Sequence, residues 1–454
     1  MKKFVPFILL ILISQSCDVD RDVAPLQHLP ESTTLVQGKA VIKVLPYAQG
    51  WLSVQETLQP QYLITQPKRD LVWLSTDFHE LSRYTPPSDW SLIDAVIHPS
   101  GEVSAALINL DLTLDDTRSH LLEIKILRIK LDGSTTEILL QPLPVEGERT
   151  RFFPASLDRI RLEAFNEDVY VVARWEYNEV EAFRLGFSKD KFVIKWQTQV
   201  EPDAYAGSIG IIGGGYDNFH QGDRYFFVYS GIDSQGNLYV AVPSHEDVLT
   251  SHDLKFNENL SAEADPATYD WGVAILTKVS PNGERKYSSL HGRLTNKRLI
   301  NLRVGEGSVY FIGRVKTGSE PASWDAWLLT ADASTGNMKH ESQIDIEAGD
   351  MFWDVSPMPN GGALAVGTKG YVQNPAGLSV SDVRQAAALV IDGKGKVTSE
   401  ITVPQGPSER GSEVMFTRLI GKGNVLFAGI HNAPGTHAEI YCDGFIAVQD
   451  FVIE

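Results

Sequence analysis

The stretch Gly236-Asn237-Leu238-Tyr239-Val240-Ala241-Val242 joins a turn signal to a run of apolar and β-branched residues. This pattern predicts a tight turn that leads into a buried β-strand. The pattern returns six more times, at residues 49–54, 101–107, 167–173, 307–313, 361–367 and 423–429. The copies start 52 to 71 residues apart, and such an interval holds about four strands with their loops. The sequence therefore predicts a repeat protein with seven similar units.

Each recurring strand is preceded by one apolar segment and followed by two more. In the second unit the four segments are 93–97, 103–110, 121–131 and 136–140, with turn signals at Gly101 and Gly133. Turns of this kind suit hairpins between antiparallel strands. The fourth unit repeats the order with segments at 225–229, 238–242, 272–279 and 284–289. We therefore expect an all-β protein whose units are four-stranded antiparallel sheets.

The last unit and the N-terminus complement each other. The third strand of the last unit, residues 444–452, runs almost to the end of the chain, so that unit lacks a fourth strand. Residues 34–44 have a strand pattern but belong to no unit. A ring of sheets closes when strands from both termini share one sheet, and closure removes the open sheet edge. The sequence thus predicts a seven-bladed β-propeller over residues 34–454, closed by the N-terminal strand.

Residues 325–337 carry the most complete copy of the second half of the repeat, an apolar strand that ends with Asp332, Gly336 and Asn337. With the Gly-Asn-apolar strands, this repeat resembles those of secreted and lipid-anchored bacterial propeller proteins, and also quinoprotein-type propeller repeats. The quinoprotein-type repeat usually has a Trp a few residues later, where this chain has Met338-Lys339-His340. The resemblance implies a propeller fold, and it rests on residues that shape turns.

Composition limits the classes of partner. The chain of 454 residues is 43% hydrophobic and 22% charged, as expected of a folded globular protein. Its net charge of −18 argues against nucleic acid and against electrostatic attraction to anionic lipid. We expect a single domain that is a monomer or part of an envelope complex.

The N-terminus has the pattern of an export signal. Lys2 and Lys3 precede an apolar run over residues 4–13, which is short for a membrane span. The run ends at Ser14-Gln15-Ser16-Cys17, which resembles the cleavage site of bacterial lipoproteins, although that family usually has an aliphatic residue where Ser14 stands. The resemblance implies a signal peptide over 1–16, a lipidated Cys17, and a tether over 17–33.

Two alternatives stay open at this end of the chain. Cleavage by an ordinary signal peptidase would leave Cys17 unmodified, and Cys17 would then be free to pair with Cys442, the only other cysteine. Lipidation would place the protein in the cell envelope, with the outer membrane or cell surface favoured over the inner membrane. The lipid would then be its only contact with the membrane.

Catalytic signatures are missing from the sequence. It has no Gly-x-Ser-x-Gly, no His-Glu-x-x-His and no phosphate-binding Walker loop. We therefore expect that the protein is not an enzyme and has no cofactor. The alternative is a propeller lyase or glycosidase, which would need a close pair of carboxylates or a His and Tyr pair in its central funnel.

The long connections are the candidates for recognition. In a propeller, the connections between second and third strands lie on the same face as the connections between blades, and here they are rich in polar and aromatic residues. The candidate ligand-binding residues are His220, Asp223, His245, Asp247, Trp271, Trp324, Tyr371 and His431. Asp247 and Asp253 are the candidates for a Ca²⁺ site. The alternatives are a solvated acidic surface, and aromatic side chains that pack between blades.

These observations favour an extracytoplasmic, lipid-anchored propeller. We expect it to act as a binding or scaffold protein for a protein or glycan partner on the long-connection face. The alternatives are a carbohydrate-active propeller enzyme and a scaffold for envelope assembly.

Overall fold

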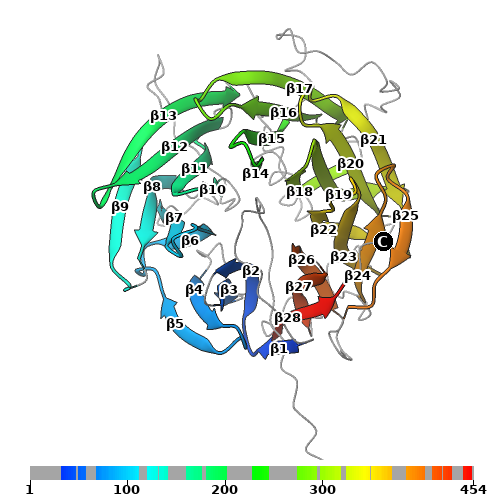
Figure 1. Ribbon diagram of the computed structural model, residues 1–454, viewed down its shortest axis with the longest axis horizontal. Coiled ribbons are helices and arrows are strands. Elements are labelled where there is room, and N and C mark those ends of the chain that lie inside the picture. The colour runs from blue at the N-terminus through cyan, green and yellow to red at the C-terminus, as the bar shows by residue number, and fades with distance from the viewer. Residues whose placement is uncertain are drawn as a thin grey trace, which may run out of the picture.

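The protein is described by a computed structural model of the whole chain. The residues described are 32–47, 50–57, 68–111, 120–130, 132–141, 160–175, 180–201, 228–244, 273–293, 297–317, 324–347, 349–370, 385–403, 412–421, 423–431 and 443–451. They form strands and turns, with no helix among them. Seven four-stranded antiparallel sheets stand around a centre (Figure 1), which confirms the predicted seven-bladed propeller.

Each of the first three blades is a meander in which sequence neighbours pair. Blade 1 consists of β2 (Ala40–Tyr47), β3 (Gly50–Thr57), β4 (Lys68–Ser75) and β5 (Glu80–Tyr84). Blade 2 consists of β6 (Ser91–Ile97), β7 (Val103–Asp111), β8 (His120–Ile129) and β9 (Thr135–Leu140). Blade 3 consists of β10 (Ile160–Phe165), β11 (Asp168–Arg174), β12 (Val180–Ser188) and β13 (Lys191–Glu201).

Blades 4 to 6 repeat this order. Blade 4 consists of β14 (Tyr229–Ile232), β15 (Leu238–Ser244), β16 (Val273–Val279) and β17 (Arg285–Arg293). Blade 5 consists of β18 (Lys297–Gly305), β19 (Ser308–Lys316), β20 (Trp324–Asp332) and β21 (Met338–Ile344). Blade 6 consists of β22 (Met351–Pro357), β23 (Ala363–Lys369), β24 (Gln385–Ile391) and β25 (Val397–Glu400). β14 begins at Tyr229, the last residue of the first strand predicted for this blade, and residues 225–227 of that prediction lie outside the described residues.

Blade 7 closes the ring with strands from both ends of the chain. It consists of β26 (Ser412–Ile420), β27 (Asn424–His431), β28 (Asp443–Asp450) and β1 (Ser32–Val36). β1 pairs antiparallel with β28 and places Thr34 opposite Ile446. In Figure 1 the first strand, in blue, lies beside the last, in red. The terminal closure is therefore confirmed.

The extent of the closing strand was predicted wrongly. The pattern over residues 34–44 contains two elements, because β1 ends at Val36 and β2 starts at Ala40 as the inner strand of blade 1. A turn with Gly38 in the left-handed region, at φ of 68°, separates them. Glycine adopts that conformation without steric cost, so the chain can leave blade 7 and enter blade 1 within a few residues.

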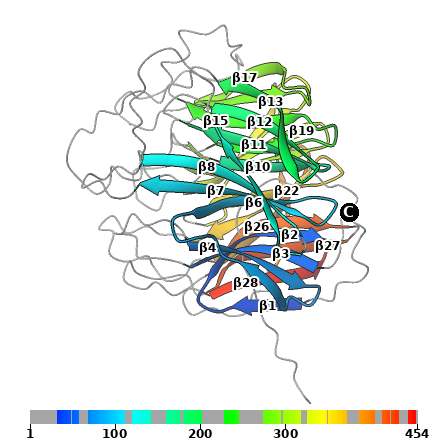
Figure 2. The ribbon, with the colours of Figure 1, turned by 90° about the vertical axis from the view of Figure 1, so that its left-hand side faces the viewer.

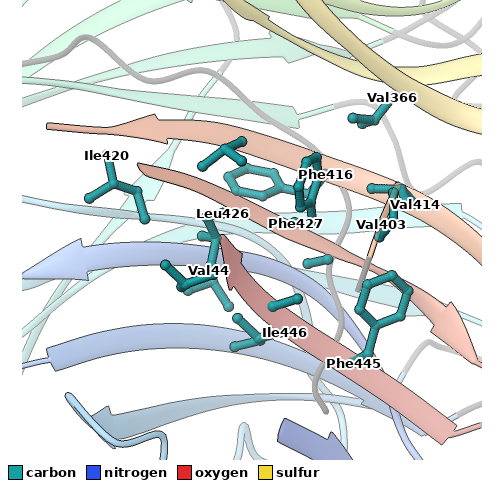
Figure 3. Packing of buried hydrophobic residues seen from close by; sticks show 14 of the residues in the cluster. Val44, Val366, Val403, Val414, Phe416, Ile420, Leu426, Phe427, Phe445 and Ile446 are labelled. Atoms are coloured by element: carbon teal, nitrogen blue, oxygen red, sulfur yellow. The ribbon is translucent and has the colours of Figure 1, made fainter. Parts of the chain in front are cut away.

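Burial falls from the centre of each blade to its rim. The second strands, such as β11 with its run Val169-Tyr170-Val171-Val172-Ala173, are buried on both faces because a blade packs on each side. The outer strands β5 and β25 are mostly exposed and polar. The core therefore lies between blades, as Figure 3 shows where Val44, Val366, Phe416 and Ile446 from blades 1, 6 and 7 meet.

The inner strands share a local irregularity. In the described residues, β2, β6, β18, β22 and β26 each contain a β-bulge close to their start. A bulge inserts one residue and turns the side chains near it away from the regular alternation. The residues that follow the inserted one include Lys43, Asp94, Asn301 and Asp354, which are polar although their strands are otherwise largely apolar.

The bulge in β6 lets one carboxylate join three blades. Asp94 accepts a hydrogen bond from Lys43 Nζ of blade 1 at 2.7 Å and one from the backbone N–H of Leu162 of blade 3 at 2.9 Å. All of these groups are buried. Asp94 thus fixes the spacing of blades 1, 2 and 3.

Asp354 of β22 also joins three blades through one carboxylate, on the other side of the ring. It accepts hydrogen bonds from Arg303 Nε and Nη2 of blade 5, each at 2.9 Å, and from the backbone N–H of Thr417 of blade 7 at 3.0 Å. Its side chain is fully buried. Neither aspartate was among the predicted site residues, although each is the one Asp in an otherwise largely apolar inner strand.

Candidate functional site

The direction of the strands gives the propeller two chemically different faces. The turns between first and second strands, and between third and fourth strands, lie on one face, which we call the turn face. On the opposite, long-connection face, second strands end and third strands begin, and the inner strands also start there. Figure 2 shows the ring from the side, with the strands running from one face to the other.

On the turn face, hydrogen bonds join neighbouring blades. Three tyrosines at the same position of consecutive second strands reach a backbone carbonyl in the next blade. Their hydroxyls donate to these carbonyls at 3.0 to 3.1 Å, in the pairs Tyr170 to Gly236, Tyr239 to Ala333 and Tyr310 to Gly361. These tyrosine hydroxyls are therefore occupied in joining blades on the turn face.

The long-connection face carries buried ionisable groups where its strands begin and end. Arg174 ends β11, Glu181 lies at the start of β12, and Glu413 lies at the start of β26; all three are buried. Burying a charge is costly unless it is paired. The Glu181 carboxylate accepts a hydrogen bond from the indole N–H of Trp175 at 2.9 Å. Trp175 is therefore a structural residue of blade 3.

Trp324 lies on the predicted face, but its ring is largely covered. It is the first residue of β20 and only 9% exposed. The guanidinium of Arg314 on β19 lies over the indole, 4.1 Å from the ring centroid. This cation–π contact favours the interpretation that Trp324 packs within the fold over the interpretation that it offers an exposed ring to a ligand.

His431 also lies on the long-connection face, in a different blade. It ends β27, opposite Ser412 on one side and Asp443 on the other, and is 8% exposed. Burial lowers the pKa of His431, and the negative charge of Asp443 opposes this shift in part. The imidazole is therefore held toward its neutral form. Trp324 and His431 share a face, but blade 6 separates their blades.

The other predicted site residues lie outside the described residues. They are Cys17, His220, Asp223, His245, Asp247, Asp253, Trp271 and Tyr371. Within the described ranges, no group of three or more His, Cys, Asp or Glu residues is placed to hold a metal ion. The same ranges contain no helix long and apolar enough to cross a membrane.

A buried carboxylate that was not among the predicted site residues lies next to Trp324. Asp350 directly precedes β22, is fully buried, and donates its backbone N–H to the carbonyl of Trp324 at 2.7 Å. Its Oδ2 accepts the backbone N–H groups of Ile346 at 2.6 Å and Glu347 at 2.8 Å. Burial raises the pKa of Asp350 to about 6. Nothing in the local sequence marked it, because its burial depends on blade 5 packing against the start of blade 6.

We call the group formed by Trp324, Arg314, Asp350, Glu347 and Lys369 the Trp324 corner. Lys369 ends β23 and lies with its Nζ 3.4 Å from Glu347 Oε1 and 3.0 Å from Glu400 Oε1. The corner brings an aromatic ring, a buried carboxyl and ion pairs together at the long-connection face.

The inner strands supply no free catalytic pair among the described residues. Asp94 and Asp354 are buried carboxylates near the centre, but each is held by a basic side chain and a backbone N–H. These contacts occupy the oxygens that a reaction would need. Both aspartates are structural.

Comparison with known proteins assigns this chain to no family. No family model matches the sequence, and no curated protein matches it. Among solved structures, the polysaccharide lyase Uly1 is 9% identical, with 97% of each chain covered and a TM-score of 0.46. A prolyl endopeptidase is 12% identical over 91% of this chain, which spans 50% of its length, with a TM-score of 0.44. The WD40 β-propeller domain of Doa1 is 11% identical over 90% of this chain and 97% of its own, with a TM-score of 0.38.

The comparison corrects one expectation. We expected that the protein is not an enzyme, whereas most of these similar structures come from enzymes, including peptidases, a lyase and an arabinofuranosidase. The propeller architecture therefore gives no ground for excluding catalysis. At these identities the likeness concerns architecture alone, and it assigns no activity to this chain.

Proposed function

We propose that this chain is a lipid-anchored propeller of the cell envelope that holds a protein partner on its long-connection face. The observation that carries the proposal is the difference between the two faces. On the turn face, tyrosines and ion pairs such as Arg128 with Glu167 join neighbouring blades, whereas strands on the long-connection face lead into the long connections, whose sequences are rich in polar and aromatic residues. Long connections of this composition suit recognition of a partner.

Cross-linking tests which face is used. A photoreactive amino acid is placed at the exposed residues Lys68 and Gln385, which begin third strands on the long-connection face. The matched positions Asp132 and Lys394 are equally exposed in third-to-fourth turns on the opposite face. Illumination of intact envelopes should give a discrete adduct from the first pair only. Adducts from the turn-face pair alone would contradict the proposal, and an added glycan that competes with the adduct would indicate a glycan ligand instead.

The anchor is tested separately. Lys2, Lys3, the apolar run over residues 4–13 and Cys17 support lipidation. Each buried CH₂ of an acyl chain contributes about 0.8 kcal/mol, and stable attachment takes more than one chain. Cys17→Ser should release the protein from the membrane or block its processing, while Cys442→Ser should not. Mass spectrometry that finds an unmodified mature N-terminus would rule the anchor out.

A further inference from the structure

The register of the closing strand fixes where the chain enters the ring. β1 runs antiparallel to β28, with Ser32 opposite Val448 and Val36 opposite Gly444. β28 is a third strand, so it starts on the long-connection face and ends on the turn face. Ser32 therefore lies toward the turn face, on the outer strand of blade 7, and Figure 2 shows β1 at the edge of the ring. The segment that precedes Ser32 in the sequence joins the ring on that side.

This entry point matters because the proposed lipid anchor lies on the preceding segment. Residues 17–31 number 15, and a fully extended chain of this length spans at most about 50 Å. The eight residues of β28 rise about 26 Å from one face to the other. A membrane on the turn-face side is reached directly from Ser32. A membrane on the other side is reached only after the chain passes back along the height of the ring, which uses about half of its full extension and leaves it fewer conformations.

The charges of the two faces differ in the same sense. Between the strand bounds given above, the segments that join strands on the long-connection face hold 25 Asp and Glu residues and 9 Lys and Arg residues. The segments that join strands on the turn face hold 9 and 5. The segments of the long-connection face thus account for most of the net charge of −18. A membrane with anionic lipids has a negative surface potential, so it repels this face more strongly than the turn face.

We propose that the anchored propeller lies with its turn face toward the membrane and its long-connection face toward the aqueous phase. The partner of the long-connection face is then a protein that approaches through the aqueous phase, and not one embedded in the same membrane. This inference rests on the proposed lipid anchor and partner binding, and it adds the direction in which the binding face points. The entry point of the chain and the difference in charge support it independently.

Energy transfer to labelled lipids measures the orientation. The mature lipidated protein, with one genetically introduced fluorescent amino acid, is added to preformed phosphatidylcholine vesicles that contain an acceptor-labelled lipid. The fluorescent positions form two matched pairs, Lys68 with Asp77 at the two ends of β4, and Gln385 with Lys394 at the two ends of β24. All four positions are exposed. The first position of each pair lies on the long-connection face and the second on the turn face.

Transfer from Asp77 and Lys394 should exceed transfer from Lys68 and Gln385 at least twofold, because about 26 Å separates the two faces. The difference should grow at low salt in vesicles that also contain anionic phosphatidylglycerol, because repulsion of the acidic face is then weakly screened. One pair loses a lysine on the long-connection face and the other loses one on the turn face. A change of charge therefore cannot cause the same difference in both pairs.

Equal transfer from the two faces in both kinds of vesicle would overturn the inference, because the ring would then stand on its rim or turn freely. Stronger transfer from the long-connection face would overturn it as well. A difference confined to the anionic vesicles would support the orientation through charge alone.

The outcome is separable from that of the proposed function. If transfer is equal from the two faces while the photoreactive residue at Gln385 still gives its adduct, the inference fails and the proposed partner binding stands. If transfer favours the turn face but no adduct forms, the orientation stands and the proposed partner binding fails. A protein that does not stay with the vesicles would reject the anchor, and the orientation with it.

Discussion

Two left-handed glycines of blade 5 show how a single residue can join two blades. Gly336 has a φ of 75°, and a Cβ built on it would lie 2.5 Å from Cε2 of Tyr287 in blade 4. Gly307 has a similar φ of 67°, but no atom lies within 4 Å of the same position. Both glycines avoid backbone strain, and only Gly336 also allows close approach of the neighbouring blade.

Alanine at the two positions should therefore have different effects. Gly307→Ala should cost about 1 kcal/mol from backbone strain alone. Gly336→Ala should cost more, by about 1 to 3 kcal/mol, because Tyr287 must move and its hydrogen bond to Ala333 is strained. Urea unfolding of both variants measures the difference. Equal losses would show that Tyr287 adapts freely and that the inter-blade contact contributes little.

Buried His98 makes the stability of the fold depend on pH. Its Nδ1 lies 3.1 Å from the carbonyl oxygen of Asn166, so it carries the proton, and Nε2 accepts from the Ser104 hydroxyl at 2.8 Å. Burial, followed by the positive charge of Arg128, lowers the pKa of His98 to about 3. The folded state therefore keeps a neutral imidazole at pH values where the unfolded chain binds a proton.

The sign of the effect follows from this difference. Because folding lowers the pKa of His98, the unfolded chain binds a proton below about pH 6.5 that the folded chain does not bind. The free energy of unfolding is therefore highest above about pH 6.5 and falls by up to about 1.4 kcal/mol per pH unit below it. His98→Gln should reduce the dependence of the unfolding free energy on pH between 6 and 4.5, whereas His79→Gln, at an exposed position, should not. Identical slopes in all three proteins would show that His98 is protonated in the folded state.

Among the described residues, four of the five bulged inner strands place a polar side chain directly after the inserted residue, and the exception is Phe416 in β26. In β22 the bulge precedes Asp354, which then reaches Arg303 in β18 and the backbone of β26. A buried ion pair adds little net stability over an apolar pair, but removing one partner leaves a buried charge alone. The aspartate therefore defines how blades 5, 6 and 7 fit together more than it adds free energy.

This account predicts a non-additive pair of substitutions. Asp354→Ala should cost about 3 to 5 kcal/mol, because Arg303 loses its carboxylate. Arg303→Met in the same protein should recover part of that loss by removing the uncompensated charge. The control is Lys394→Ala, at an exposed turn, which should stay within about 0.5 kcal/mol of wild type. Additive losses in a double-mutant cycle would contradict a direct interaction.

The stability of the ring depends on its closing strand. β1 covers the edge of β28, and Leu35 and Val36 pack against the core cluster shared by blades 6, 7 and 1. An uncovered strand edge invites pairing with another chain. The ring should therefore be less stable and more prone to associate when β1 is missing.

Two truncations test the closure. A chain that begins at Gln37 lacks β1, and it should melt at a lower temperature and aggregate more readily than a chain that begins at Ser32. Thermal unfolding followed by circular dichroism and light scattering compares the two proteins. Indistinguishable melting temperatures and scattering would show that the last blade is complete with three strands.

The sequence alone determined the blade count, the order of strands and the closure between termini. Those features depend on local signals, since turn residues and short apolar runs repeat along the chain wherever a strand starts. The boundary between β1 and β2 was missed because one continuous strand pattern spans both, and only Gly38 marks the break.

The tertiary structure decided which polar residues matter. Asp354 and Thr417 meet although 63 residues separate them, and Trp324 lies under Arg314 because β19 and β20 pair in one particular register. The burial of Asp350 likewise follows from the packing of blade 5 against blade 6. A local pattern carries no information on such contacts, because they form only when the ring brings distant segments together.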